Sequence, residues 1–249
     1  MRNVLATNMS LAPVDYDFGV PANYAFAETI TCSNDEARKM YVEAFGHMLN
    51  YNHEQAIACF TKCAELDENC AMAWWGIAYC LSSSYNWSAG LGPGYDAISQ
   101  AVALKDHCSE LEQDLIMALS KRHTKEARDN ANPAALNMGN SPELNQAFAD
   151  AMAPLYEKYK GNLDVTAIYV EALMNLNPWT LWNKDAASGE ITPVDDSTLM
   201  LIKIMEDAFE NVPGAKEHPA LCHLYCHALE LSPYPCLLYT SPSPRDPVS

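Results

Sequence analysis

Basic residues are scarce in this chain of 249 residues, and their scarcity excludes several functions. Lys and Arg number 15, against 32 Asp and Glu, which gives a formal net charge of −17. Proteins that bind nucleic acid need clustered Lys and Arg to meet the phosphates, and anionic membrane surfaces attract the same residues. We therefore expect neither nucleic acid nor a membrane among the partners of this protein.

The chain also lacks long apolar runs and the usual catalytic sequence motifs. No stretch approaches the roughly 18–20 consecutive apolar residues of a membrane span, and the first residues do not form a signal peptide, so we expect a cytoplasmic protein. The nine cysteines include no Cys-x-x-Cys pair, and most of them fall within apolar helical patterns, as reduced buried thiols do. Phosphate-binding loops, nucleophile elbows and EF-hand loops are absent as well.

Helix signals are abundant by contrast. Few segments alternate with a period of two residues, and no Asn-Gly or Asp-Gly turn separates apolar runs. Capping residues and prolines set the boundaries of the expected helices. These helices lie at about 35–49, 53–67, 71–83, 95–104, 110–127, 142–160, 164–176, 193–211 and 219–231. Residues 178–192 are predicted to form a loop.

Composition divides the chain into three segments. Residues 1–32 are predicted to be an irregular leader, residues 33–235 a helical-repeat domain, and residues 236–249 a disordered tail. Five of the fifteen prolines fall between Pro233 and Ser249, and proline cannot extend a helix pair. The tail resembles translated adapter sequence, so we interpret it as a sequence artefact. The alternative is a genuine disordered tail rich in Pro and Ser.

Residues 54–81 resemble a tetratricopeptide repeat (TPR) that passes from its second helix into the first helix of the next repeat. The matching positions are Ala56, Phe60, Cys63, Leu66, Asp67, Trp74 and Ala78. Small residues let two helices approach closely, and the aromatic residues fill the gap between them. We therefore predict an all-α fold, a TPR-like α-solenoid of antiparallel helix pairs, with Ala56, Phe60, Trp74 and Ala78 in one buried cluster.

A wider resemblance covers most of residues 35–235. It relates the chain to the N-terminal half of a family of longer TPR-like proteins of unassigned biochemistry. Three blocks carry it, namely residues 52–56 with 70–78, residues 171–174 with 177–182, and residues 218–220 with 223–230 and 232–233. The resemblance implies a chain truncated at its C-terminus. The last helix would then lack its stacking neighbour, so we expect Leu221, Leu224 and Leu229 to be exposed.

Stacked helix pairs form a concave groove that binds extended peptides or partner helices. We therefore predict a binding or scaffold protein for a protein or peptide ligand, without catalytic residues or a cofactor. The groove candidates are His53, Trp179 and Trp182. His53 is expected to pack within the turn between two helices. The two tryptophans either line a ligand pocket or fasten their loop with two buried rings.

The alternative function is that of a metal-dependent enzyme or metal-binding protein. His223, His227 and Glu230 project from one stripe of the last helix, and His218 stands at its entry. Two imidazoles one helical turn apart and a carboxylate would suit zinc or ferrous iron. The competing interpretation is a polar seam in which these side chains hydrogen-bond to a neighbouring helix pair. His47 is expected to face solvent.

Overall fold

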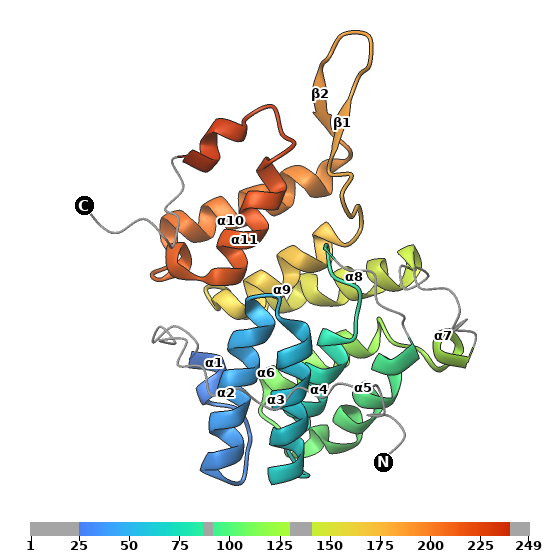
Figure 1. Ribbon diagram of the computed structural model, residues 1–249, viewed down its shortest axis with the longest axis vertical. Helices are drawn as coiled ribbons and strands as arrows, with labels where there is room; N and C mark the ends of the chain where they lie inside the picture. The colour runs from blue at the N-terminus through green and yellow to red at the C-terminus, as the bar shows by residue number, and fades with distance from the viewer. Residues whose placement is uncertain (1–24, 87–91, 130–140, 240–249) are drawn as a thin grey trace. The chain divides into compact units, whose positions relative to one another are not determined.

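The computed structural model describes residues 25–86, 92–129 and 141–239, which form helices and one short hairpin (Figure 1). This predominance of helix agrees with the predicted all-α class. The chain divides into two compact units, Met1–Ala151 (unit 1) and Met152–Ser249 (unit 2). Most of the predicted leader (1–24) and tail (240–249) lies outside the described residues. No helix in the described part of the chain is both long and apolar enough to cross a membrane.

Unit 1 is a series of helices that follow one another along the chain. They are α1 (Ala25–Glu28), α2 (Asp35–Leu49), α3 (His53–Leu66), α4 (Ala71–Cys80), α5 (Gly92–Leu104), α6 (Glu110–Ser120) and α7 (Lys125–Asp129). Each helix from α1 to α5 packs on the next along the chain, and α7 packs on α5. Helix α8 (Pro142–Lys158) begins in unit 1 and ends in unit 2.

Capping side chains fix the helix starts of unit 1 where the sequence predicts them. The Asn34 side chain accepts a hydrogen bond from the Ala37 N–H at 2.7 Å and so begins α2. Ser109 and Glu112 form a reciprocal capping box at the start of α6. The Glu112 carboxylate also accepts two hydrogen bonds of 2.7 Å from the backbone N–H and hydroxyl of Thr31. One buried carboxylate thereby fastens the segment before α2 to α6.

Close packing of α3 on α4 depends on one glycine. A Cβ atom at Gly76 would lie 2.4 Å from Phe60 Cζ, so only glycine admits the aromatic ring. Ala56, Phe60 and Ala78 are fully buried as predicted, but Trp74 is only half-buried. Its neighbour Trp75 is the fully buried tryptophan instead. Helix α4 is apolar on all sides, so its sequence alone does not decide which indole faces the core.

The last residues of the predicted leader are ordered rather than irregular. Helix α1 packs on α2, and the rings of Phe26 and Phe45 lie 5.8 Å apart between centroids. Ile30 is buried too, at 2 % exposure. The hydrophobic side chains of residues 26–30 therefore belong to the core of unit 1, because burying apolar surface offsets the entropy lost by ordering the chain.

Unit 2 contains three longer helices that contact one another, preceded by the end of α8. They are α9 (Leu163–Met174), α10 (Asp196–Asn211) and α11 (Pro219–Leu229). Asn162 caps α9 by accepting from the Asp164 and Val165 N–H groups, and Pro219 occupies the first position of α11. Phe209 of α10 meets Tyr225 of α11 edge to face, with centroids 5.2 Å apart.

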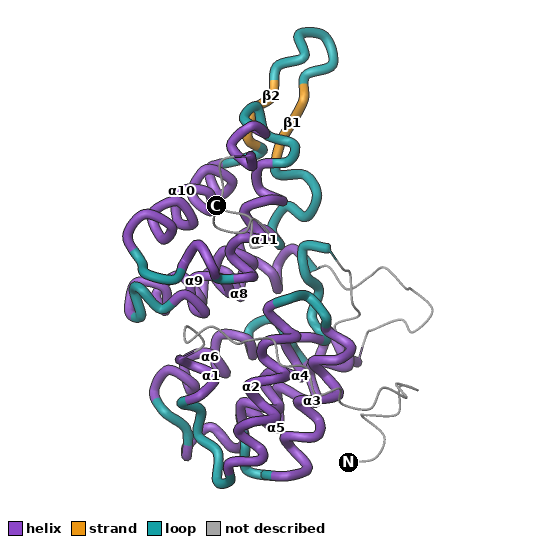
Figure 2. Tube along the Cα trace, turned by 60° about the vertical axis from the view of Figure 1, so that its left-hand side comes forward, coloured by secondary structure: helices purple, strands orange, loops and turns teal. Residues whose placement is uncertain are grey.

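A β-hairpin interrupts the segment predicted as a loop. Strand β1 (Trp182–Lys184) pairs antiparallel with β2 (Ile191–Pro193), and the hairpin projects from the helices of unit 2 (Figure 2). Its turn uses Gly189, whose φ of 73° favours glycine. At its base, the Thr198 hydroxyl of α10 donates to the buried Leu181 carbonyl at 3.2 Å. The base of the hairpin is therefore held by α10.

The last α-helix does not expose its leucines. Leu221, Leu224 and Leu229 are buried, each at 2 % exposure or less, so the prediction of an exposed apolar face is wrong. Helix α11 packs against α9 and α10. Beyond the helix, the large hydrophobic residues Leu231, Tyr234 and Leu237 are exposed, at 53 %, 59 % and 39 %.

Candidate functional site

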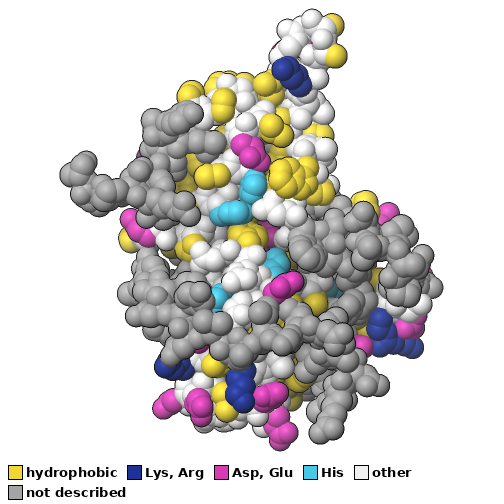
Figure 3. Space-filling view, viewed as in Figure 1, with side chains coloured by type: hydrophobic (Ala, Val, Ile, Leu, Met, Phe, Trp, Pro, Cys, Tyr) yellow, Lys and Arg dark blue, Asp and Glu magenta, His cyan; other side chains and the backbone are white. Residues whose placement is uncertain are grey.

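Helix α11 brings three of the predicted site residues together near its C-terminal end. The imidazoles of His223 and His227 are T-shaped, with centroids 4.7 Å apart. His227 Nδ1 lies 2.8 Å from Glu230 Oε1, so Glu230 leans back along the helix to reach the histidine. The side chains of His227 and Glu230 are 17 % and 38 % exposed. Histidine, acidic and apolar side chains reach the surface beside one another in this unit (Figure 3).

The two histidines of this cluster experience different environments. Burial and, less strongly, the neighbouring His227 lower the pKa of His223 to about 4, while Glu230 opposes the shift. His223 is therefore neutral at pH 7, and a neutral imidazole can offer a nitrogen lone pair to a metal ion. His227 is held through Nδ1 by a carboxylate, an arrangement that fixes the orientation of metal-binding histidines in many proteins.

Trp179 lies beside the cluster and stays exposed. Its ring meets that of His227 edge to face with centroids 5.7 Å apart, and 51 % of the residue is exposed. Its φ of 61° is unusual for a residue other than glycine, and such backbone strain gathers at functional sites. The sequence interpretation with two buried rings is therefore wrong for Trp179.

Trp182 has a different role from Trp179. It is half-buried, and its indole N–H donates to the Ala228 carbonyl at 2.7 Å. Ala228 is in the last turn of α11, where carbonyl groups have no partner inside the helix. Trp182 thereby fastens the hairpin to the helix end next to His227.

His218 is not part of the cluster. It caps α11 by accepting from the Leu221 N–H through Nδ1 at 3.3 Å, and its Nε2 lies 3.2 Å from Asp164 Oδ1. Because Nδ1 accepts, Nε2 carries the proton and donates to the carboxylate. Both side chains are buried. The structure therefore gives His218 a role in joining α11 to α9.

His53 lies in unit 1, at the first residue of α3, as the sequence predicts for a packed turn residue. Burial lowers its pKa to about 4, and its Nε2 makes no hydrogen bond to any described residue. The centroid of its ring lies 5.9 Å from the ring centroid of Tyr51, which has a φ of 60°. The strained tyrosine beside His53 carries no sequence signal, because backbone strain is set by the surrounding fold.

A second group of ligand-type side chains was not predicted from the sequence. Glu43 and His47 of α2 come together with Cys59 of α3 in the interior of unit 1. His47 is 1 % exposed, so the expectation that it faces solvent is wrong. The i, i+4 spacing of Glu43 and His47 is the only signal that could have pointed to this group, and it is common on helices.

Comparison with known proteins leaves the class of this protein open. No protein-family model, no curated protein and no solved structure matches the chain. The resemblance to the TPR-like family therefore stays a prediction, and the function has to be inferred from the geometry of these side chains.

Proposed function

We propose that unit 2 binds a divalent transition-metal ion through His223 and His227, with Glu230 orienting the second histidine. The observation that carries this proposal is the 2.8 Å contact between His227 Nδ1 and Glu230 Oε1 beside the second imidazole. A carboxylate that holds one imidazole nitrogen fixes the tautomer whose other nitrogen binds metal. Glu230 thus supports the site even where it does not touch the ion.

The dimensions of the cluster support one shared ion. Zinc–nitrogen bonds of about 2.0–2.1 Å allow a single ion to bridge two nitrogens up to about 4 Å apart. The ring centroids are separated by 4.7 Å, and their planes stand at 76° to each other. One ring must turn about its side-chain torsions so that both lone pairs face the ion. His223 is neutral at pH 7 and needs to lose no proton for this.

The donor set selects the class of metal. Two imidazole nitrogens and a carboxylate favour zinc or ferrous iron over the oxygen-seeking magnesium and calcium. Two or three protein ligands leave coordination positions for water or a small ligand, unlike a closed structural zinc site. Trp179, exposed at 51 % and in contact with His227, places an apolar ring beside the cluster.

Zinc titration by calorimetry tests the proposal on the full chain, reduced and stripped of metal, at pH 7.5. We expect the double variant His223→Ala, His227→Ala to lose one equivalent of bound zinc. Glu230→Gln should weaken that equivalent by about tenfold, since loss of such a supporting partner costs about 10–100-fold in affinity. His107→Ala is the matched control, because His107 is an exposed histidine of unit 1. Identical isotherms for wild type and double variant would contradict the proposal.

We also propose that the helices form a TPR-like α-solenoid that binds a protein or peptide. Consecutive contacts from α2 to α3 to α4, and the close Phe60–Gly76 approach, support the repeat arrangement. The exposed and strained Trp179 supports peptide binding, because exposed tryptophans are frequent anchors of interfaces. Its neighbour His227 would add a polar contact.

Panning a random displayed-peptide library on the immobilised full chain tests this second function. The selected peptides are then titrated by fluorescence anisotropy against wild type, Trp179→Ala and Tyr234→Ala. We expect Trp179→Ala to weaken binding at least tenfold. Tyr234→Ala should leave it unchanged, although Tyr234 is an aromatic residue of similar exposure, at 59 %. Failure to select any peptide, or equal binding by Trp179→Ala, would refute the assignment of this surface.

A further inference from the structure

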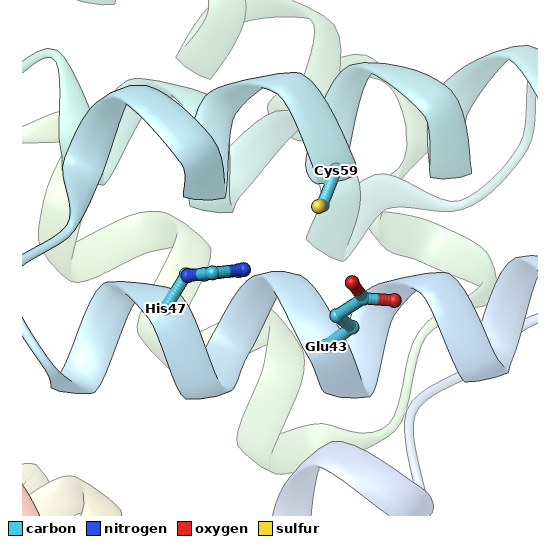
Figure 4. Close-up of side chains that lie close together, drawn as sticks. All are labelled: Glu43, His47 and Cys59. Atoms are coloured by element: carbon cyan, nitrogen blue, oxygen red, sulfur yellow. The ribbon is translucent and has the colours of Figure 1, made fainter. Parts of the chain in front are cut away.

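Three donor groups of different chemistry meet inside unit 1. Glu43 and His47 lie one turn apart on α2, and Cys59 faces them from α3. One ligand atom of each, a carboxylate oxygen, an imidazole nitrogen and a thiol sulfur, lies within 4.8 Å of the other two. Figure 4 shows the three side chains converging on the space between the two helices.

The side chains of these three donors are buried. Glu43 is 9 % exposed, His47 is 1 % exposed and Cys59 is fully buried. Placing a carboxylate, an imidazole and a thiol in a helix interface is unfavourable unless they satisfy one another or bind an ion. The Cys59 thiol also accepts a hydrogen bond from the Gln55 amide at 3.9 Å, so the metal proposal is based on the convergence of the three ligand atoms.

His47 can bind a metal ion through its far ring nitrogen once the Asn52 amide turns. Its Nδ1 lies 3.2 Å from Asn52 Nδ2, while the ring nitrogen farther from the main chain points toward Cys59 and Glu43 (Figure 4). Metal-binding histidines usually donate their other ring N–H to an acceptor, whereas here the Asn52 amide donates to Nδ1, so the far nitrogen carries the proton in the metal-free protein. When an ion takes the far nitrogen, Nδ1 carries the proton, and the Asn52 amide has to turn to present its oxygen. An amide side chain offers both a donor and an acceptor, so Asn52 can serve either state.

We propose that Glu43, His47 and Cys59 bind a zinc-type divalent ion that clasps α2 to α3. Bonds of about 2.0–2.3 Å to oxygen, nitrogen and sulfur place tetrahedral donors about 3.3–3.8 Å apart. The side chains therefore close in by roughly 1 Å from separations of up to 4.8 Å. Mixed oxygen, nitrogen and sulfur donors exclude magnesium and calcium. The fourth position takes a water molecule.

The ion would change the chemistry of the thiol. Burial and the charge of Glu43 raise the pKa of Cys59 to about 11, so the metal-free thiol is protonated at pH 7. A bound divalent cation favours the thiolate, and binding releases a proton. Because the ion binds only where α2 and α3 are folded together, it stabilises unit 1 against unfolding. The site is independent of the proposed α11 site.

Cobalt titration of the full chain, reduced and metal-free, tests the clasp, because a thiolate bound to cobalt gives an intense near-ultraviolet charge-transfer band. We expect the band in wild type, and we expect Cys59→Ser to abolish it. Cys63→Ser is the matched control, because Cys63 is a fully buried cysteine one turn along the same helix. The double variant His223→Ala, His227→Ala should keep the band, which separates this site from the α11 site. Zinc should raise the unfolding temperature of wild type but not of Cys59→Ser.

Two further variants keep the test decisive. Glu43→Gln preserves the shape of the side chain and all sulfurs, so it should fold like wild type and bind cobalt at least tenfold more weakly. The variant Cys63→Ser, Cys70→Ser removes a different sulfur pair, whose atoms lie 3.8 Å apart. The clasp would be overturned if wild type lacked the band, or if the band survived in Cys59→Ser. It would also be overturned if Glu43→Gln bound cobalt with unchanged affinity, or if the band were lost only in the Cys63–Cys70 variant.

Discussion

The two groups of ligand-type side chains, one in each unit, share a spacing and differ in depth. Glu43 and His47 on α2 and His223 and His227 on α11 are both i, i+4 pairs. The pair on α2 faces a neighbouring helix and is almost completely buried. The α11 cluster lies at a helix end, where His227 and Glu230 keep contact with solvent at 17 % and 38 % exposure.

The contrast shows that helical spacing determines which side chains are neighbours, whereas packing determines their exposure and therefore their possible functions. A buried donor set stabilises the fold around it and exchanges its ion only when the helices open locally. A half-exposed set can take up water or a small ligand in its open positions. Unit 1 would therefore use a metal to hold α2 and α3 together, and unit 2 would present a metal to ligands from solution.

The largest effect should come from a comparison of two tryptophans. Trp75 is fully buried and donates its indole N–H to the Leu115 carbonyl at 3.2 Å, whereas Trp179 is 51 % exposed. Trp75→Ala should lower the free energy of unfolding by about 3–5 kcal/mol, the usual cost of truncating a core aromatic. Trp179→Ala should cost less than about 1 kcal/mol. Urea unfolding of both variants measures the difference, and equal losses would contradict the assigned depths.

A smaller difference should separate the two histidines that stand at equivalent places in the two groups. His47→Ala leaves a cavity between α2 and α3, so it should cost about 2–3 kcal/mol in metal-free protein. His227→Ala removes a contact that solvent can replace, and it should cost about 0.5–1 kcal/mol. Thermal unfolding of both variants in the presence of a chelator provides the measurement. A costlier His227→Ala would reverse the comparison.

The smallest difference between the two units should lie in their loss of stability in acid. Burial lowers the pKa values of His53 and His223 from 6.5 to about 4. The unfolded chain therefore takes up a proton near pH 6.5 that the folded chain resists until about pH 4. The stability that each neutral histidine contributes is complete above pH 6.5 and is lost as the pH falls toward 4.

Glutamine variants separate the two contributions. Between pH 7 and pH 4.5, wild type should lose about 2 kcal/mol more than His53→Gln, because one pKa unit corresponds to about 1.4 kcal/mol. Over the same pH range, wild type should lose about 1 kcal/mol more than His223→Gln, because solvent screens the α11 site more strongly. Urea unfolding at the two pH values gives these differences. A pH dependence that neither substitution reduces would show that other groups control acid stability.

Local chemistry made most of the helices predictable. Asn34 and the Ser109–Glu112 capping box begin α2 and α6 where expected, because a cap depends only on residues within one turn. The orientation of α4 was not predictable, since a helix that is apolar on all sides gives no preference between Trp74 and Trp75. The hairpin at residues 182–193 was missed because its strands have only three residues each and rely on α10 for anchoring.

Some residues of the candidate sites could be predicted from the sequence and others could not. Neighbours on one helix follow from the helical repeat, so the grouping of His223, His227 and Glu230 could be predicted from α11 alone. His218 was misplaced because its partner Asp164 lies on another helix, 54 residues away in sequence. Cys59 could not be joined to Glu43 and His47 without knowing which faces of α2 and α3 meet. Contacts between helices depend on packing, which the pattern of a single helix does not specify.

The rate at which a chelator removes zinc from the loaded protein tests the contrast between the two units most directly. We predict two phases of one equivalent each, followed by stopped-flow absorbance of the chelator. The fast phase should be absent from His223→Ala, His227→Ala, because the α11 site is open to solvent. The slow phase should be absent from Cys59→Ser, because the clasp releases its ion only through local opening of α2 and α3. A single phase that both variants leave unchanged would contradict the account.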